Sequence, residues 1–206
     1  EEFNVSNRII MAGSRVIKEF SRPMTFRQVQ SIAYAHKIAQ IALEGAEHPI
    51  DVLQFKVLSA ENQTKAKTAI ERCPGKFVLV SNRVRLDEWS RRATRGKKLH
   101  VTDDMISDYS KRFPDDLIPE IWKRIKQSGL RTYWEDGSKE DDYEISARNI
   151  GQTPEGKRVL LEFNYEGTHF RFGKPSAWRL GKEKARRIRA LIEEFERECA
   201  AKESKA

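Results

Sequence analysis

The chain has 206 residues, of which 39 are lysine or arginine and 31 are aspartate or glutamate, giving a formal net charge of +8. Its mean hydropathy is −0.70, and no apolar run approaches the ~18 residues that a membrane-spanning helix needs. We therefore expect no membrane partner. The regular spacing of apolar residues argues against general disorder, and the excess of positive charge favours a polyanionic partner.

The cysteines suggest a reducing compartment. Cys73 and Cys199 lie far apart in the sequence, without a CxxC pair or a histidine at metal-ligand spacing. This usage is typical of intracellular proteins, and the first residues do not resemble a secretory signal. We expect an intracellular protein, cytoplasmic or nuclear, without a metal or other cofactor.

The first part of the chain is predicted to begin with two helices. Apolar residues in 8–20 recur at helical spacing. Thr25 and Gln28 have the sequence of a capping box, which predicts a second helix that begins after Thr25 and ends near Gly45.

Two strands and three further helices are predicted next. Residues 51–60 alternate between apolar and polar side chains, and residues 76–82 form a second short apolar run, so both are predicted strands. Helices are predicted over 62–73, from a cap at Thr102 to Phe113, and over 115–129.

The last part of the chain has a different texture. Residues 130–135, 143–150 and 157–172 are predicted strands, the last dividing at residues 166–167 into a hairpin. A long helix with one apolar stripe is predicted from Lys182 to Cys199.

These elements predict the α+β class. We expect a helical and β-α-β region over residues 1–129 and a small antiparallel sheet backed by a C-terminal helix over residues 130–206, or one continuous domain. A small sheet followed by one covering helix is a layout shared by several nucleic-acid-binding modules, including the arm-binding domains of phage integrases and single-strand binders. No family motif accompanies this layout.

The positive charge is concentrated in two blocks. Residues 81–101 contain seven lysines or arginines against two acids, and residues 171–189 contain eight against one. Cations that neutralise phosphates release counterions, and exposed aromatic rings such as Trp178 stack on bases. We expect the following residues to contact nucleic acid: Arg83, Arg85, Arg91, Arg92, Arg95, Lys97, Lys98, Arg171, Lys174, Trp178, Arg179, Lys182 and Arg186.

Other functions stay open. A metal-dependent nuclease would use Asp142, Glu144 and Glu162 as ligands, although Asn164 stands two residues after Glu162, where nucleases of the PD-(D/E)xK type have a lysine. The blocks could also be a solvated surface or dock on an acidic protein partner. We expect His36 in the core and His169 at the surface, and no catalytic motif is present. The leading expectation is a non-enzymatic nucleic-acid-binding protein, with DNA favoured over RNA, that regulates or assists a nucleoprotein complex.

Overall fold

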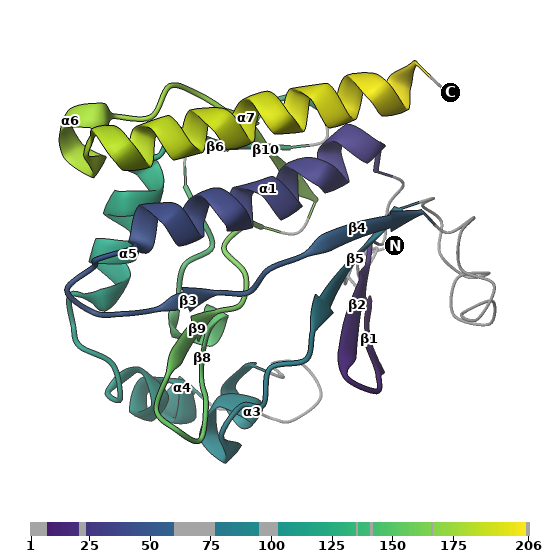
Figure 1. Ribbon diagram of the computed structural model, residues 1–206. Helices are drawn as coiled ribbons and strands as arrows, with labels where there is room; N and C mark the ends of the chain where they lie inside the picture. Colours follow the sequence, from purple (N-terminus) through teal and green to yellow (C-terminus); the bar gives the residue numbers. More distant parts are fainter. Residues whose placement is uncertain are drawn as a thin grey trace.

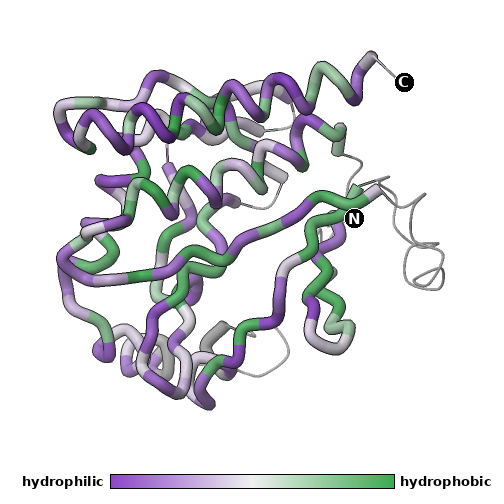
Figure 2. Tube along the Cα trace, in the orientation of Figure 1, coloured by the Kyte–Doolittle hydropathy of each residue, from purple (hydrophilic) through white to green (hydrophobic). Residues whose placement is uncertain are grey.

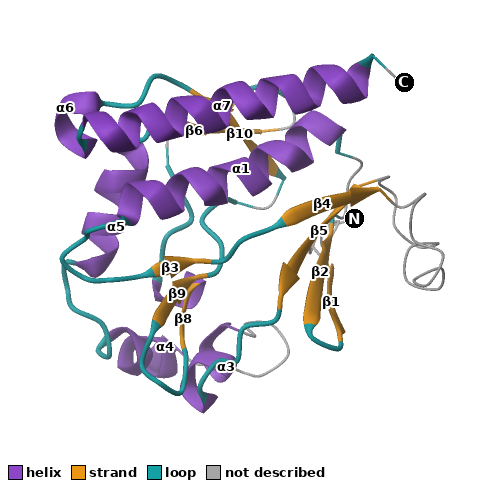
Figure 3. Cartoon of the chain, viewed as in Figure 1, coloured by secondary structure: helices purple, strands orange, loops and turns teal. Residues whose placement is uncertain are grey.

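The computed structural model describes residues 8–20, 24–59, 77–94, 103–134, 136–140, 142–165 and 167–204 (Figure 1). Helices and antiparallel strands both occur in this part of the chain (Figure 3), which confirms the predicted α+β class. The predicted helix over 62–73 and the cap at Thr102 lie outside the described residues.

The strands of the described ranges form three small sheets. All strand pairs are antiparallel except β3–β9, which is parallel. In spatial order, the first sheet is β1 (Arg8–Ala12), β2 (Arg15–Glu19), β5 (Phe77–Asn82) and β4 (Lys56–Ser59); the second is β10 (Thr168–Phe172), β6 (Leu130–Trp134) and β7 (Lys139–Glu140); the third is β3 (Asp51–Val52), β9 (Arg158–Leu160) and β8 (Ile150–Gln152).

The helices pack against these sheets and against one another. None of the described helices is both long enough and apolar enough to cross a bilayer. Their bounds are α1 (Phe26–Leu43), α3 (Glu88–Thr94), α4 (Asp103–Ser110), α5 (Leu117–Gln127), the 3-10 turn η2 (Ala147–Asn149), α6 (Ala177–Leu180) and α7 (Lys182–Glu203).

Helix α1 is the centre of the fold. Thirteen of its 18 residues are buried, and the predicted capping box of Thr25 and Gln28 is present at its start. The helix contacts α5, α7, β10, β3 and the first sheet. In Figure 1 it lies between α7 and the strands of the third sheet. The predicted helix from Thr25 to Gly45 is therefore confirmed.

Helix α7 lies antiparallel to α1 and is clamped to it at both ends (Figure 1). Arg27 donates to Glu196 and Glu203 at one end, at 2.7 and 2.9 Å. At the other end Arg187 makes two hydrogen bonds to the carboxylate of Glu44, at 2.6 and 2.8 Å. This hydrogen-bonded guanidinium lowers the pKa of Glu44 below its ordinary value.

The interface between the clamps combines apolar packing with hydrogen bonds from Gln30 to Glu198 and from Tyr34 to Glu194. Ile188 and Cys199 are fully buried in it, and the Phe195 ring contacts Tyr34 of α1 and Phe172 of β10 edge to face. In Figure 2 the tube of α7 alternates between hydrophilic and hydrophobic colours, as expected for a helix with one apolar stripe. Burial raises the pKa of the Cys199 thiol to about 11.

Four strand and helix predictions were wrong. The single strand predicted over 51–60 is two strands, β3 and β4, which belong to different sheets. Residues 8–20 form the β1–β2 hairpin rather than a helix, because Gly13 adopts a positive φ of 60° and reverses the chain. Residues 143–150 contain η2 and only the first residue of β8. The two halves of 157–172 do not pair with each other, since β9 belongs to the third sheet and β10 to the second.

One hydrophobic cluster links the two predicted regions. It includes Phe20, Ile38 and Leu79 from before residue 129 and Phe163 and Ile188 from after it. The sheet of β10, β6 and β7 packs on α1, and α7 packs on α1 in turn. Side chains from both sides of the predicted boundary are therefore buried together.

The α1–α7 packing can be tested at Ile188. Because this side chain is fully buried in the main cluster, Ile188→Ala should lower the free energy of unfolding by about 2–5 kcal/mol, measured by urea unfolding. The exposed neighbour Arg189 gives a matched control, and Arg189→Ala should change stability by less than about 0.5 kcal/mol. Equal midpoints for the two variants would show that α7 is not docked.

Candidate functional site

Helix α5 presents an apolar face to the core and a basic face to solvent. Leu117, Ile121 and Ile125 are buried at the spacing of one helical face. Lys123 and Lys126 lie on the other side and are exposed. The helix was predicted over these residues and is confirmed.

The loop after β10 is attached to the C-terminal end of α5 by main-chain contacts. The N–H of Gly173 donates to the carbonyl of Gly129 at 2.7 Å, and the N–H of Ser176 donates to Gln127 at 2.9 Å. Gly129 has a φ of 85°, and a Cβ there would lie 2.6 Å from the Gly173 carbonyl oxygen. A side chain at Gly129 would therefore separate the loop from the helix.

This attachment forms an open groove between α5 and the segment that begins α6. The groove has a volume of 580 Å³. Trp178 is 82% exposed at its edge, and the guanidinium of Arg179 lies 5.0 Å from the centre of its ring. Residues that line the groove are Trp122, Lys123, Lys126, Gln127, Lys174, Ser176, Trp178 and Arg179.

A smaller hollow of 220 Å³ continues the groove toward β6 and β7. Lys126 lines both, so the two are adjacent. Arg131 and Lys139 also line the hollow. On the second sheet, Arg131 of β6 lies directly opposite Arg171 of β10, and the Arg171 guanidinium stacks 4.1 Å from the ring centre of Tyr133.

We call this continuous region the basic surface. Like charges placed side by side repel, and like charges on directly opposite strand residues are destabilising. Within the described part of the chain, six of these cations form no ion pair with a carboxylate: Lys123, Lys126, Arg131, Arg171, Lys174 and Arg179. An anion bound here would relieve that repulsion.

Two acids lie at the margin of the basic surface, and both are engaged by tryptophans. Glu140 accepts a hydrogen bond from the indole of Trp134 at 2.7 Å. Asp142 accepts one from the indole of Trp122. The second bond fixes the Trp122 ring, over which the Lys126 ammonium lies at 4.4 Å from the ring centre.

The structure brings together four residues predicted from the second basic block. Arg171, Lys174, Trp178 and Arg179 all belong to the basic surface. Arg186 lies on α7 and makes a hydrogen-bonded ion pair with Glu183 at 2.7 Å. Lys182 and Arg186 are both exposed, and neither lines the groove or the hollow.

The first basic block lies elsewhere. Arg83, Arg85 and Arg91 are exposed on the segment from β5 to α3, and Figure 1 shows α3 at the opposite end of the molecule from α6. The helix is anchored there, since Ser90 donates its N–H to Asp87 and its hydroxyl lies 2.9 Å from that of Tyr109. The other predicted residues of this block, Arg92, Arg95, Lys97 and Lys98, lie outside the described residues or side chains.

The sequence did not single out the contributions of α5 and the second sheet. Trp122, Lys123, Lys126, Arg131 and Lys139 come from short stretches in which cations alternate with apolar residues. Such stretches also describe the solvated face of any amphipathic helix. Two lysines three residues apart beside a tryptophan were the one available signal.

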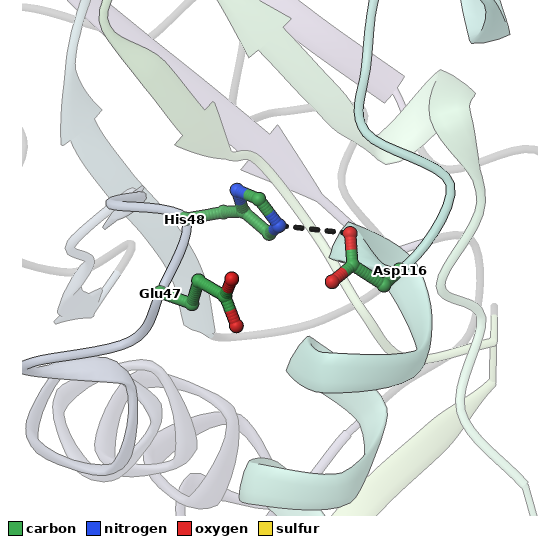
Figure 4. A group of neighbouring side chains, drawn as sticks. All are labelled: Glu47, His48 and Asp116. Atoms are coloured by element: carbon green, nitrogen blue, oxygen red, sulfur yellow. Dashed lines mark hydrogen bonds and ion pairs between the residues drawn. The ribbon is translucent and has the colours of Figure 1, made fainter.

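The three acids considered for a nuclease do not gather. Glu162 forms an ion pair with the buried Lys18, Asp142 accepts from Trp122, and Glu144 is exposed. Among the described residues, the one group whose ligand atoms lie within 4.8 Å of one another is Glu47, His48 and Asp116 (Figure 4). It shares no residue with the predicted set.

The contacts around this group show that it anchors a loop. Figure 4 shows His48 bonded to Asp116, at 2.8 Å, between the loop after α1 and the start of α5. Glu120 accepts the backbone N–H groups of Glu47 and His48, at 3.1 and 3.4 Å, and an ion pair from Arg124 at 2.9 Å. The group therefore fixes the position of α5 relative to α1.

The predictions for the burial of His36 and His169 had different outcomes. His36 is fully buried, as expected, and burial lowers its pKa to about 3, so the ring is neutral. His169 was expected at the surface, but it is 9% exposed. It lies beside Tyr133 on β6, and burial lowers its pKa below the ordinary value.

Comparisons of the chain with protein-family models, with curated proteins and with solved structures found no match.

The main-chain contact at Gly129 can be tested against a glycine in open space. Gly129→Ala combines an unfavourable φ with a clash against Gly173, whereas Gly45 has a φ of 65° and nothing within 4 Å of the Cβ position. We expect Gly45→Ala to cost about 1–2 kcal/mol from backbone strain and Gly129→Ala to cost more. Chemical unfolding measures both. Equal losses would show that the Gly129–Gly173 approach is not tight.

The loop anchor predicts a pH dependence. Burial opposes ionisation of Glu120, but the N–H groups of Glu47 and His48 and the Arg124 guanidinium prevail, so its pKa is lowered. A lowered pKa stabilises the fold above the pKa of the unfolded chain, about 4.3, and that contribution is lost as the pH falls through the folded value. Glu120→Gln should therefore destabilise by about 1–3 kcal/mol at pH 7 and progressively less below pH ~4.

Thermal unfolding from pH 7 to pH 3 measures this dependence. Glu193 is exposed on α7, so Glu193→Gln serves as the control and should follow the parent curve. A constant difference between Glu120→Gln and the parent across the pH range would contradict the anchor.

Proposed function

We propose that this protein binds nucleic acid through the basic surface, as a non-enzymatic component of a nucleoprotein complex. The observation that carries the proposal is the set of six lysines and arginines without carboxylate partners around Trp122 and Trp178. Phosphate groups are polyanions that such cations neutralise with release of counterions. The same cations contact phosphates wherever they lie, so they position the protein without reading sequence.

The grouping in space supports the proposal more than the net charge does. Many basic proteins bind no nucleic acid, and several cations elsewhere on this chain are paired with acids, as Arg27 is with Glu196 and Glu203 and Arg187 is with Glu44. Such pairs neutralise charge locally. The basic surface lacks this neutralisation among its six cations, which is the pattern expected for an anion-binding surface.

The first basic block is a competing contact surface. Arg83, Arg85 and Arg91 are exposed, but they line neither the groove nor the hollow. Because the two surfaces lie at opposite ends of the molecule in Figure 1, variants of one leave the other unchanged. The separation allows each contribution to be measured independently.

The test compares two matched charge reversals. In the first variant, Lys123, Lys126 and Lys174 are changed to Glu; in the second, Arg83, Arg85 and Arg91 are changed to Glu. All six side chains are exposed, so both variants should keep the parent melting temperature. Binding to labelled duplex DNA, single-stranded DNA and RNA is titrated at several salt concentrations.

We expect the first variant to weaken binding to every nucleic acid by more than about tenfold and to flatten the slope of log affinity against log salt by about 2–3 units. The second variant should bind almost as the parent does. Loss of binding in the second variant alone would show that nucleic acid binds at the segment from β5 to α3 instead. Absence of binding by the parent at low salt would favour an acidic protein partner instead.

A further inference from the structure

Trp178 is placed as a stacking platform rather than as a packing residue. Its side chain is 82% exposed although it is the largest apolar side chain of its segment. Arg179 lies 5.0 Å from the ring centre, while the adjacent Leu180 is buried and holds α6 against the molecule. One turn of helix thus anchors itself through Leu180 and leaves the indole accessible.

A second tryptophan lies in the same groove. The Trp122 indole is fixed by its hydrogen bond to Asp142 and by an edge-to-face contact with Tyr143, at 6.2 Å between ring centres. Both rings line the groove of 580 Å³ together with cations from α5 and from the loop after β10. Aromatic and cationic groups are therefore interleaved along the groove.

The adjoining sheet face repeats this combination. Arg131, Tyr133, His169 and Arg171 lie on one face of the β6–β10 pair, because they are directly opposed in register and alternate with the buried Thr132. The Arg171–Tyr133 stack gives the face a second flat, positively charged group. Arg131 of this sheet face lines the hollow. Lys126 lines both the hollow and the groove, so the sheet face and the groove are connected.

Interleaved aromatic rings and cations suit an unpaired nucleotide strand. In a duplex the faces of the bases are covered by their neighbours, so a protein that contacts duplex through phosphates gains nothing from an exposed ring. In a single strand each base has an accessible face that stacks on an aromatic ring, while the cations track the phosphates. Arginine guanidiniums add to this stacking.

Resting on the proposed function above, we infer that the basic surface binds single-stranded nucleic acid in preference to duplex, with an unpaired base stacked on Trp178 and its phosphates held by the cations of the groove. The shared chemistry is an unpaired nucleotide, which DNA and RNA both supply. The 2′-hydroxyl distinguishes the two sources, so both are tested.

The experiment uses the full chain and oligonucleotides of equal length: oligo-dT, oligo-rU and a mixed-sequence duplex. Trp178→Ala should weaken binding to both single strands by roughly 5- to 100-fold, the range expected for one lost stacking contact, and leave duplex binding within about twofold. Trp178→Phe keeps a smaller ring and should retain most of the affinity. Binding of the parent to oligo-dT or oligo-rU should also quench tryptophan fluorescence.

The other exposed tryptophan gives the matched control. Trp89 is 45% exposed and belongs to the first basic block, so Trp89→Ala should bind all three oligonucleotides as the parent does. Equal loss on duplex and single strands for Trp178→Ala, or loss for Trp89→Ala instead, would overturn the inference while leaving nucleic-acid binding intact. Failure of the parent to bind any of them would overturn the proposed function itself.

Discussion

The fold depends on one constraint: α1 is buried on most sides, so the polar side chains on its buried faces need hydrogen-bond partners inside the protein. The Ser31 hydroxyl accepts the N–H of Phe170 at 2.9 Å. The His36 ring lies 2.7 Å from the carbonyl of Leu53, and Gln40 accepts a backbone N–H of β3. These bonds fix β10 and β3 against the helix. Since β10 leads directly into the loop that carries Trp178, the position of the basic surface follows from α1.

The elements that the sequence predicted are those specified locally. The box at Thr25 and the stripe of α7 need only neighbouring residues, and both are confirmed. Residues 8–20 contain apolar side chains compatible with a helix or a hairpin, and a glycine at positive φ decides for the hairpin. The pairing of 157–172 failed for another reason. Its first half pairs with the neighbouring β8 and the distant β3, and its second half pairs with the distant β6. The long-range pairings leave no local pattern in the sequence.

The same distinction applies to the candidate site. Trp178 and its neighbouring cations could be predicted because charge is dense along that segment. The contribution of Lys126 could not be predicted, because a lysine on an amphipathic helix is expected to be solvated unless the segment that faces it is known. What joins the two is a contact between the backbones of Gly129 and Gly173. Main-chain contacts of this kind leave almost no pattern in the sequence, apart from the glycines themselves.

The burial of Cys199 allows the opening of the α1–α7 interface to be measured through the reactivity of this thiol. With the side chain fully covered and its pKa raised to about 11, the thiol is protonated and shielded at neutral pH. A thiolate-specific reagent can reach it only when the end of α7 opens from α1. The rate of alkylation at this position therefore measures the free energy of a local opening, separate from global unfolding. The same measurement shows whether binding of a ligand at the basic surface raises or lowers the free energy of opening between α1 and α7.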